Sequence, residues 1–260
     1  MTELLGPRSA RIRAYAALKK RAERERQGRM LVEGPRLIAR ALEAGLLPEA
    51  ILAHPDLDPE SQKLLAWAPG PVLWVSERAL ERVSTREHPA RLIGVFPLPD
   101  RRLESAGLSE RPLVLVLFGL EKPGNLGAIL RSADATGVDA VLVVGGTDLY
   151  SPQVIHNSTG VVFRLPVYPA SEQEALDWIR LRGLTLVAAS PRAERLYWDF
   201  DWRPPVALAL GAEHEGLPER WMRQAQVRLR IPMRGLADSL NVSVAAALLL
   251  YEALRQRLNP

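Results

Sequence analysis

Three segments of this 260-residue chain are rich in glycine and polar residues, and each follows a predicted buried strand. They run over residues 119–127, 211–217 and 232–241. Ligands of an open parallel sheet bind beyond the carboxyl ends of its strands. We therefore expect the three segments to form one binding site. The chain has neither GxGxxG nor GK[ST] in these segments, which argues against a dehydrogenase and against a P-loop ATP-binding enzyme.

The composition excludes several other classes of chemistry. The chain has no cysteine, which rules out disulfides, thiolate metal sites, iron–sulfur clusters and cysteine nucleophiles. The four histidines are scattered and show no metal-ligand spacing, so no metal site is predicted. They are His54, His88, His156 and His214.

Nothing in the sequence predicts a targeting or membrane segment. The N-terminus lacks the short apolar run of a signal peptide. The longest uncharged apolar stretch, residues 239–251, is shorter than the about 20 residues that span a bilayer. We therefore expect a cytoplasmic protein that does not enter the membrane.

Positive charge is concentrated near the N-terminus. Nine basic and two acidic residues lie between Arg8 and Arg29, whereas the whole chain carries a net charge of only +4. Clustered arginine is typical of phosphate binding. The alternative interpretation is a solvated helix face.

The three segments carry a specific resemblance. Residues 125–134, 211–217 and 231–245 resemble, in order, the three signature motifs of the SpoU (TrmH-type) RNA ribose 2′-O-methyltransferases of the SPOUT superfamily. The resemblance covers about residues 113–258. The second motif departs from the family at Ala212, where members often carry asparagine or serine.

The rest of the chain resembles the same family more loosely. Residues 31–36, Leu-Val-Glu-Gly-Pro-Arg, are similar to the family's N-terminal substrate-binding module. Residues 150–160 are similar to a further family segment, in which members often carry arginine where this chain has His156.

The resemblance implies a cofactor, a substrate and an assembly. Members bind S-adenosylmethionine in a pocket made by a C-terminal trefoil knot, largely through backbone groups that correspond to Gly211, Ile231 and Leu240. They methylate a ribose 2′-hydroxyl of RNA and work as homodimers, with the C-terminal helix in the interface. The separate N-terminal module favours ribosomal over transfer RNA. Its expected phosphate contacts are Arg8, Arg11, Arg13, Lys19 and Lys20.

Asn125 and Arg131 are the first two expected catalytic residues. Spacing alone allows Asn125 to be a turn or cap residue and Arg131 to be a surface arginine paired with Asp134. The resemblance implies that Asn125 helps to hold Arg131 beside the ribose 2′-hydroxyl. The family's arginine has been proposed as the general base, but a guanidinium keeps its proton tightly. We predict instead that Arg131 clamps the RNA phosphate and stabilises the developing alkoxide.

Glu213, Ser239 and Asn241 complete the expected catalytic set. Glu213 is either a carboxylate favoured by a helix dipole or the anchor of Arg131 or of the third motif. Ser239 and Asn241 open the predicted last helix, where capping is the alternative role. Asn241 would lie just inside that helix, a position that helix propensity explains poorly and that therefore favours a functional role.

Hydrophobic patterning predicts an α/β fold in two parts. Residues 1–104 are the expected N-terminal α/β RNA-binding module, and 105–260 the expected SPOUT-type methyltransferase domain, with a linker over 97–112. In the second part strands and helices alternate, which predicts a mostly parallel sheet with helices on both faces. The predicted helices cover 9–27, 36–43, 62–66, 77–83, 125–136, 152–158, 171–182, 218–225 and 239–257, and the predicted strands or extended segments cover 30–32, 50–53, 72–75, 92–96, 113–118, 140–144, 163–167, 184–188, 206–210 and 227–231.

The sequence leaves two hypotheses for the function. The leading one is an S-adenosylmethionine-dependent RNA ribose 2′-O-methyltransferase. The alternative is a non-catalytic RNA-binding or ribosome-assembly protein that retains the fold. The presence of Asn125, Arg131, Glu213 and Asn241 together favours the enzyme.

Overall fold

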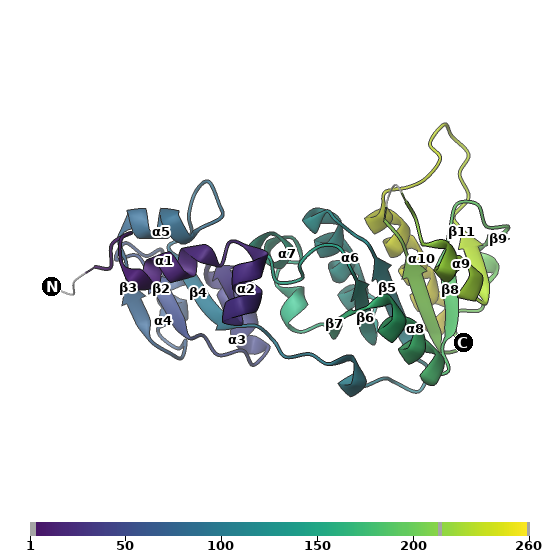
Figure 1. Cartoon of the computed structure of the whole chain (residues 1–260), viewed down its shortest axis with the longest axis horizontal. Coiled ribbons are helices and arrows are strands. Elements are labelled where there is room, and N and C mark those ends of the chain that lie inside the picture. The colour runs from purple at the N-terminus through teal and green to yellow at the C-terminus, as the bar shows by residue number, and fades with distance from the viewer. Residues whose placement is uncertain (1–3, 213–214, 259–260) are drawn as a thin grey trace. The chain divides into compact units, whose positions relative to one another are not determined.

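The computed structural model describes residues 4–212 and 215–258 (Figure 1). The chain divides into two compact units. We call Met1–Asp100 together with Asp148–Arg164 the N-terminal unit, and Arg101–Thr147 together with Leu165–Pro260 the C-terminal unit. One segment from the second half of the chain, Asp148–Arg164, thus packs with the first hundred residues. The functional division after residue 104 stays a prediction.

The N-terminal unit is built on a four-stranded sheet in the order β1-β4-β2-β3. Strand β4 (Leu92–Pro97) is antiparallel to β1 (Arg29–Glu33) and to β2 (Ala50–Ala53), and β2 is parallel to β3 (Val72–Trp74). The helices of this unit are α1 (Ala10–Ala17), α2 (Arg21–Gln27), α3 (Pro35–Glu43), α4 (Pro59–Leu65), α5 (Glu77–Val83) and α7 (Pro152–Asn157).

Side chains of α1 and α5 fill one core of this unit. Ile12 and Leu18 meet Leu80 and Val83 above buried strand residues such as Leu52. All of these side chains are almost fully removed from solvent. Helix α7 belongs to the inserted segment and packs on β1.

The predicted single helix over 9–27 is wrong, because a turn at residues 18–20 separates α1 from α2. The guanidinium of Arg24 donates to the carbonyls of Leu18 and Lys19, at 2.6 and 2.8 Å. Arg24 is only 3% exposed and also pairs with Asp148. This basic residue of the N-terminal cluster is therefore structural, and its guanidinium satisfies carbonyls at the end of α1.

The C-terminal unit holds a seven-stranded sheet in the order β7-β6-β5-β10-β8-β11-β9, and its pairings in the described residues are parallel. This confirms the predicted mostly parallel sheet. The strands are β5 (Leu113–Phe118), β6 (Ala140–Val144), β7 (Val167–Ala170), β8 (Thr185–Ala189), β9 (Arg195–Leu196), β10 (Val206–Leu210) and β11 (Val227–Arg230), and the helices are α6 (Pro123–Ala135), α8 (Glu172–Leu181), α9 (Glu219–Gln224) and α10 (Val242–Leu258).

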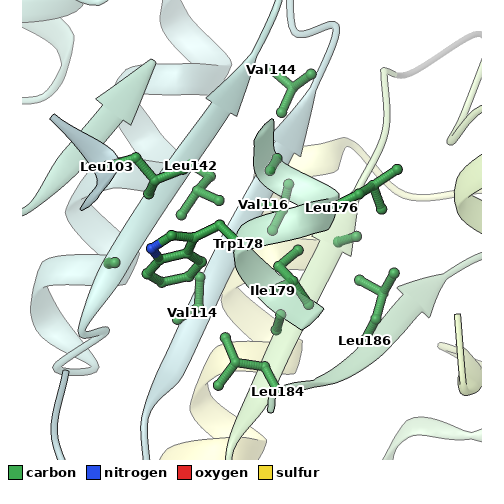
Figure 2. Packing of buried hydrophobic residues seen from close by; sticks show 14 of the residues in the cluster. Leu103, Val114, Val116, Leu142, Val144, Leu176, Trp178, Ile179, Leu184 and Leu186 are labelled. Atoms are coloured by element: carbon green, nitrogen blue, oxygen red, sulfur yellow. The ribbon is translucent and has the colours of Figure 1, made fainter. Parts of the chain in front are cut away.

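Helices cover both faces of this sheet, as predicted. Figure 2 shows Trp178 and Ile179 of α8 lying over Val114 and Val116 of β5. Successive residues of a strand point to opposite faces. The equally buried Leu115 therefore points to the other face, where α6 and α10 pack together (Figure 1).

Two local predictions were wrong, and one strand was missed. The segment 163–167 is not extended at its start, because a 3-10 turn (Val161–Phe163) follows Gly160, whose φ is +82°, and β7 begins only at Val167. The two-residue strand β9 was not predicted. Helix α10 begins at Val242 and not at Ser239.

No helix among residues 4–212 and 215–258 is long and apolar enough to cross a membrane. Within the same residues, no cluster of His, Asp or Glu side chains is placed to hold a metal ion.

Candidate active site

A pocket opens at the carboxyl ends of three neighbouring strands, β10, β8 and β11. Its empty volume is about 730 Å³, which includes the open mouth. Gly211, Ile231 and Leu240, predicted from distant parts of the sequence, all line it. The wall consists of Ala189, Ser190, Pro191, Leu210, Gly211, Ala212, Gly216, Leu229, Ile231, Met233, Ser239, Leu240, Val242, Ala245 and Leu249.

The backbone of Gly216 and Leu217 passes so close to residue 211 that only glycine fits there. The second segment folds back on itself, so that the Gly216 N–H donates to the Ala212 carbonyl at 2.9 Å. A Cβ atom on Gly211 would overlap the backbone of Gly216 and Leu217. Gly216 itself has a φ of +67°, a conformation that favours glycine. Main-chain groups therefore form this side of the pocket.

Among the described residues, no charged side chain lines this pocket. Serine hydroxyls and main-chain groups supply its polar atoms, and aliphatic side chains form the rest. Ligand pockets for small molecules combine an apolar wall with a few polar groups. The pocket therefore suits a largely apolar ligand that carries a few polar groups.

A second hollow adjoins the first, because Ala212 lines both. Gly119, Lys122, Asn125 and Glu215 are among its other residues, and its empty volume is about 550 Å³. Two main-chain bonds fix its floor: Gly119 N–H donates to Val144 O at 2.9 Å, and Thr147 N–H donates to Leu120 O at 2.6 Å. Charged and amide side chains here contrast with the apolar first pocket.

The structure brings Asn125 and Asn241 together. The Asn241 amide donates from Nδ2 to Asn125 Oδ1 at 3.2 Å, which links the first turn of α6 to the start of α10. Asn241 Oδ1 accepts from Ser243 N–H at 2.9 Å, and the Asn241 carbonyl accepts from Ala245 N–H at 3.0 Å. Asn241 is therefore the N-cap of α10. The argument that its position inside a helix favours function is wrong.

The other expected catalytic residues are Arg131, Glu213 and Ser239. Ser239 lines the pocket. Arg131 is exposed on α6 and has no hydrogen-bond or ion-pair partner among the described residues, Asp134 included. Glu213 lies outside the described residues. The catalytic roles of these residues stay predictions.

The predicted RNA contacts are exposed and lie on the N-terminal unit. They are Arg8, Arg11, Arg13, Lys19 and Lys20. Burial lowers the pKa of the Lys19 ammonium, the Glu33 carboxylate opposes this effect, and Arg82 adds to it. Lys19 therefore lies within electrostatic reach of both groups.

Sequence reasoning missed part of the pocket wall. Ala189 is the last residue of β8, and Ser190 and Pro191 follow it. Strand β8 pairs with both β10 and β11. The only feature of the sequence that could have indicated these residues was the predicted strand that ends at residue 188. Its position between the two motif-bearing strands depends on strand order, which hydrophobic patterning does not reveal.

Two family models match the chain. The SpoU rRNA Methylase family matches residues 112–251, and the MRM3-like substrate binding domain matches residues 9–94. Together they span both units.

Curated relatives align over nearly the whole chain. The 23S rRNA (uridine(2479)-2′-O)-methyltransferase of Streptomyces viridochromogenes is 33% identical, with 97% of this chain and 92% of that protein covered. The 23S rRNA (guanosine(2553)-2′-O)-methyltransferase RlmP of Bacillus subtilis is 26% identical, with 96% and 98% covered.

Solved structures show the same fold. The crystal structure of an RNA 2′-O ribose methyltransferase is 54% identical, with a TM-score of 0.86 and coverage of 98% of this chain and 100% of that one. The SpoU methyltransferase AviRb from Streptomyces viridochromogenes, in complex with AdoMet, is 32% identical, with a TM-score of 0.92 and coverage of 96% and 99%.

Proposed function

The chain belongs to the SpoU rRNA methylase family, and we propose that it transfers a methyl group from S-adenosylmethionine to a ribose 2′-hydroxyl of RNA, with ribosomal RNA as the substrate. One observation carries the proposal: Gly211, Ile231 and Leu240, which correspond to the family's cofactor-binding positions, line a single pocket. The relatives named above act on 23S rRNA, which supports the choice of substrate.

The pocket fits the cofactor chemically. The adenine ring of S-adenosylmethionine is flat and neutral, with polar edges, and the wall offers aliphatic side chains beside main-chain groups at Gly211 and Leu240. The close approach at Gly211 brings the main chain itself to this surface. When bound, the cofactor supplies a methyl group on a positively charged sulfur.

The chain's own residues position the second reactant. Orienting two bound reactants can supply about 7–11 kcal/mol of the barrier reduction. The Asn241–Asn125 hydrogen bond holds the starts of α10 and α6 together at the pocket edge. Arg131, on the same helix as Asn125, offers guanidinium donors to an RNA phosphate and to the alkoxide that develops at the sugar oxygen. Because guanidinium keeps its proton, Arg131 stabilises charge and does not act as the base; the methyl group leaves the sulfur for the sugar oxygen, and the hydroxyl proton is released to solvent.

RNA binding involves the N-terminal unit in this proposal. Exposed basic side chains such as Arg11 and Arg13 on α1 contact phosphates, which position the substrate without reading its sequence. The match of residues 9–94 to a substrate-binding domain supports this assignment.

The proposal includes a homodimer formed through the C-terminal unit. Val244, Leu248 and Tyr251 of α10 are 47%, 39% and 52% exposed, and their spacing places them along one stripe of the helix. This exposed apolar stripe, on a helix that also has the buried residues Val242, Ala246, Leu249, Leu250 and Ala253, supports a contact with a second copy. The trefoil knot around the third motif remains a proposal that rests on the family resemblance, and the cytoplasmic location remains one that rests on the sequence.

Calorimetric titration with S-adenosylmethionine tests the proposal. We expect binding with one site per chain. Failure to bind at millimolar cofactor would overturn the proposed activity and favour a non-catalytic RNA-binding protein.

A further inference from the structure

A polar pocket in the N-terminal unit has no role in the function proposed so far. Its empty volume is about 580 Å³. It lies between the chain that follows α5, the junction of β1 and α3, and helix α7 of the inserted segment. Its lining residues are Glu33, Leu37, Thr85, Arg86, Pro152, Gln153, His156 and Asn157.

Arg86 is held in place at this pocket. Its Nη2 donates to the Glu33 carbonyl at 3.1 Å and contacts Nδ1 of His156 at 3.1 Å. Its Nε lies 3.9 Å from Glu33 Oε2, beyond hydrogen-bond distance. The donors on Nε and Nη1 therefore have no hydrogen-bond partner among residues 4–212 and 215–258. The Arg86 side chain is 35% exposed, so these donors can reach a ligand.

Glu33 organises the loop and does not compete for that ligand. Its side chain is 3% exposed. Oε1 accepts from the Thr85 N–H and the Thr85 hydroxyl, both at 2.8 Å, and Oε2 accepts from the Ser84 hydroxyl at 2.6 Å. The buried carboxylate thus fixes the residues that present Arg86, and its lone pairs face inward.

The opposite wall adds further donors. Arginine can only donate, so Nδ1 of His156 must accept from Arg86. In the neutral ring the proton then lies on Nε2, which becomes a donor. Gln153 and Asn157 supply amide groups from the same short helix. Glu33 forms an ion pair with Arg86 at 3.9 Å, but the Nε and Nη1 donors of Arg86 make no hydrogen bond to it and line one pocket with the polar groups of α7, an arrangement that can bind an anion.

We propose that this pocket binds a backbone phosphate of the RNA substrate, with Arg86 as the charged donor and His156 as the residue that positions it. This inference rests on the proposed function, because it takes RNA as the ligand. Lys19 lies within electrostatic reach of Glu33, which lines this pocket, and of Arg82.

The test measures the salt dependence of RNA binding. The probe is an in vitro transcript of bacterial 23S rRNA, bound by the full chain between about 50 and 200 mM salt. Losing one phosphate contact lowers the slope of log affinity against log salt by about one. We expect that loss for Arg86→Gln. Arg91→Gln is the matched control: the Arg91 side chain is 34% exposed on the same unit and pairs with Glu77, outside the pocket.

A second variant keeps every Arg86 contact. Gln153 is exposed and lines the pocket, so Gln153→Glu brings a negative charge to the proposed phosphate without removing a guanidinium bond. We expect weaker RNA binding than for Gln153→Ala, with an unchanged melting temperature. The pocket assignment is overturned when Arg86→Gln keeps the slope of Arg91→Gln, or when Gln153→Glu binds RNA as well as Gln153→Ala.

The two proposals fail in different ways. If the wild type binds S-adenosylmethionine and methylates RNA, but Arg86→Gln leaves the salt-dependence slope unchanged, the proposed activity stands and only the phosphate pocket is overturned. If the wild type binds no cofactor, the proposed activity is overturned. The slope comparison still decides whether Arg86 contacts RNA.

Discussion

Arg131 is the residue on which the proposed chemistry most depends. It is exposed on α6 and has no partner among the described residues, so its donors are available to the substrate. Removing a donor that stabilises developing negative charge lowers turnover by about 10²–10³-fold. We predict that Arg131→Ala loses methyl transfer to this extent and keeps its affinity for S-adenosylmethionine.

Radiolabelled methyl transfer and cofactor calorimetry measure the two quantities separately. Arg180→Ala is the control, because Arg180 is an exposed arginine of α8 that pairs with Asp177. Unchanged turnover in Arg131→Ala would remove this residue from the mechanism.

Arg24 shows that a basic residue can belong to the core. Its side chain is 4% exposed and pairs with Asp148, which lies 124 positions away in the sequence. Removing one partner of a buried pair destabilises a protein by about 3–5 kcal/mol, because the other charge remains buried. We predict a loss of this size for Arg24→Met in denaturant unfolding.

Arg26→Met is the matched control for that experiment. Arg26 lies on the same helix but is 68% exposed and pairs with Glu23, and exposed pairs contribute about 0–1 kcal/mol. Equal stability of the two variants would contradict the structural role of Arg24.

At the scale of elements, the turn after β10 shapes the pocket. A Cβ on Gly211 would overlap the backbone of Gly216 and Leu217, so Gly211→Ala forces the turn away from the sheet. We predict at least a tenfold loss of S-adenosylmethionine affinity, measured by calorimetry. Gly235→Ala makes the same chemical change in the third segment, where a Cβ meets no atom within 4 Å, and retains binding. Wild-type affinity in Gly211→Ala would show that this turn does not contact the cofactor.

Helix α10 carries the proposed dimer contact. Leu248→Glu places a charge in the middle of its exposed apolar stripe, and we predict that this variant sediments as a monomer, whereas the wild type sediments as a dimer. Leu181→Glu is the control, because Leu181 is 85% exposed at the end of α8. A monomeric wild type, or a dimeric Leu248→Glu, would contradict the assignment of the interface to this stripe.

Elements with a strong local signal could be predicted from the sequence. The continuous apolar run Leu113–Phe118 is β5, buried throughout or nearly so, and the helix predicted from residue 171 is α8, which begins with a capping box of Ser171 and Glu174. The helix over 9–27 was mispredicted because Arg24 and Asp148, far apart in sequence, stabilise its break. The start of α10 was misplaced because Ser239 and Asn241 are both good N-cap residues, and local preference does not choose between them.

The candidate site could be predicted in part. The motifs gave the pocket residues Gly211, Ile231 and Leu240, whose convergence depends on the parallel strands β10 and β11. The contribution of β8 could not be predicted, because strand order in the sheet is a property of the tertiary fold. The role of Arg86 was also missed, since its neighbour His156 lies 70 positions away.

At the scale of the whole molecule, both units serve one reaction in this account. The N-terminal unit carries the exposed basic residues and the Arg86 pocket, and the C-terminal unit carries the cofactor pocket. Phosphate contacts supply affinity, whereas the cofactor pocket supplies the methyl donor. The chain should therefore need both units to modify RNA.

The most direct measurement follows the methyl group to its destination. The full chain is incubated with methyl-labelled S-adenosylmethionine and a 23S rRNA transcript, and the RNA is digested to nucleosides for mass spectrometry. We predict label on the 2′-oxygen of a ribose. Label on a base, or no transfer by a chain that binds both the cofactor and the RNA, would contradict it.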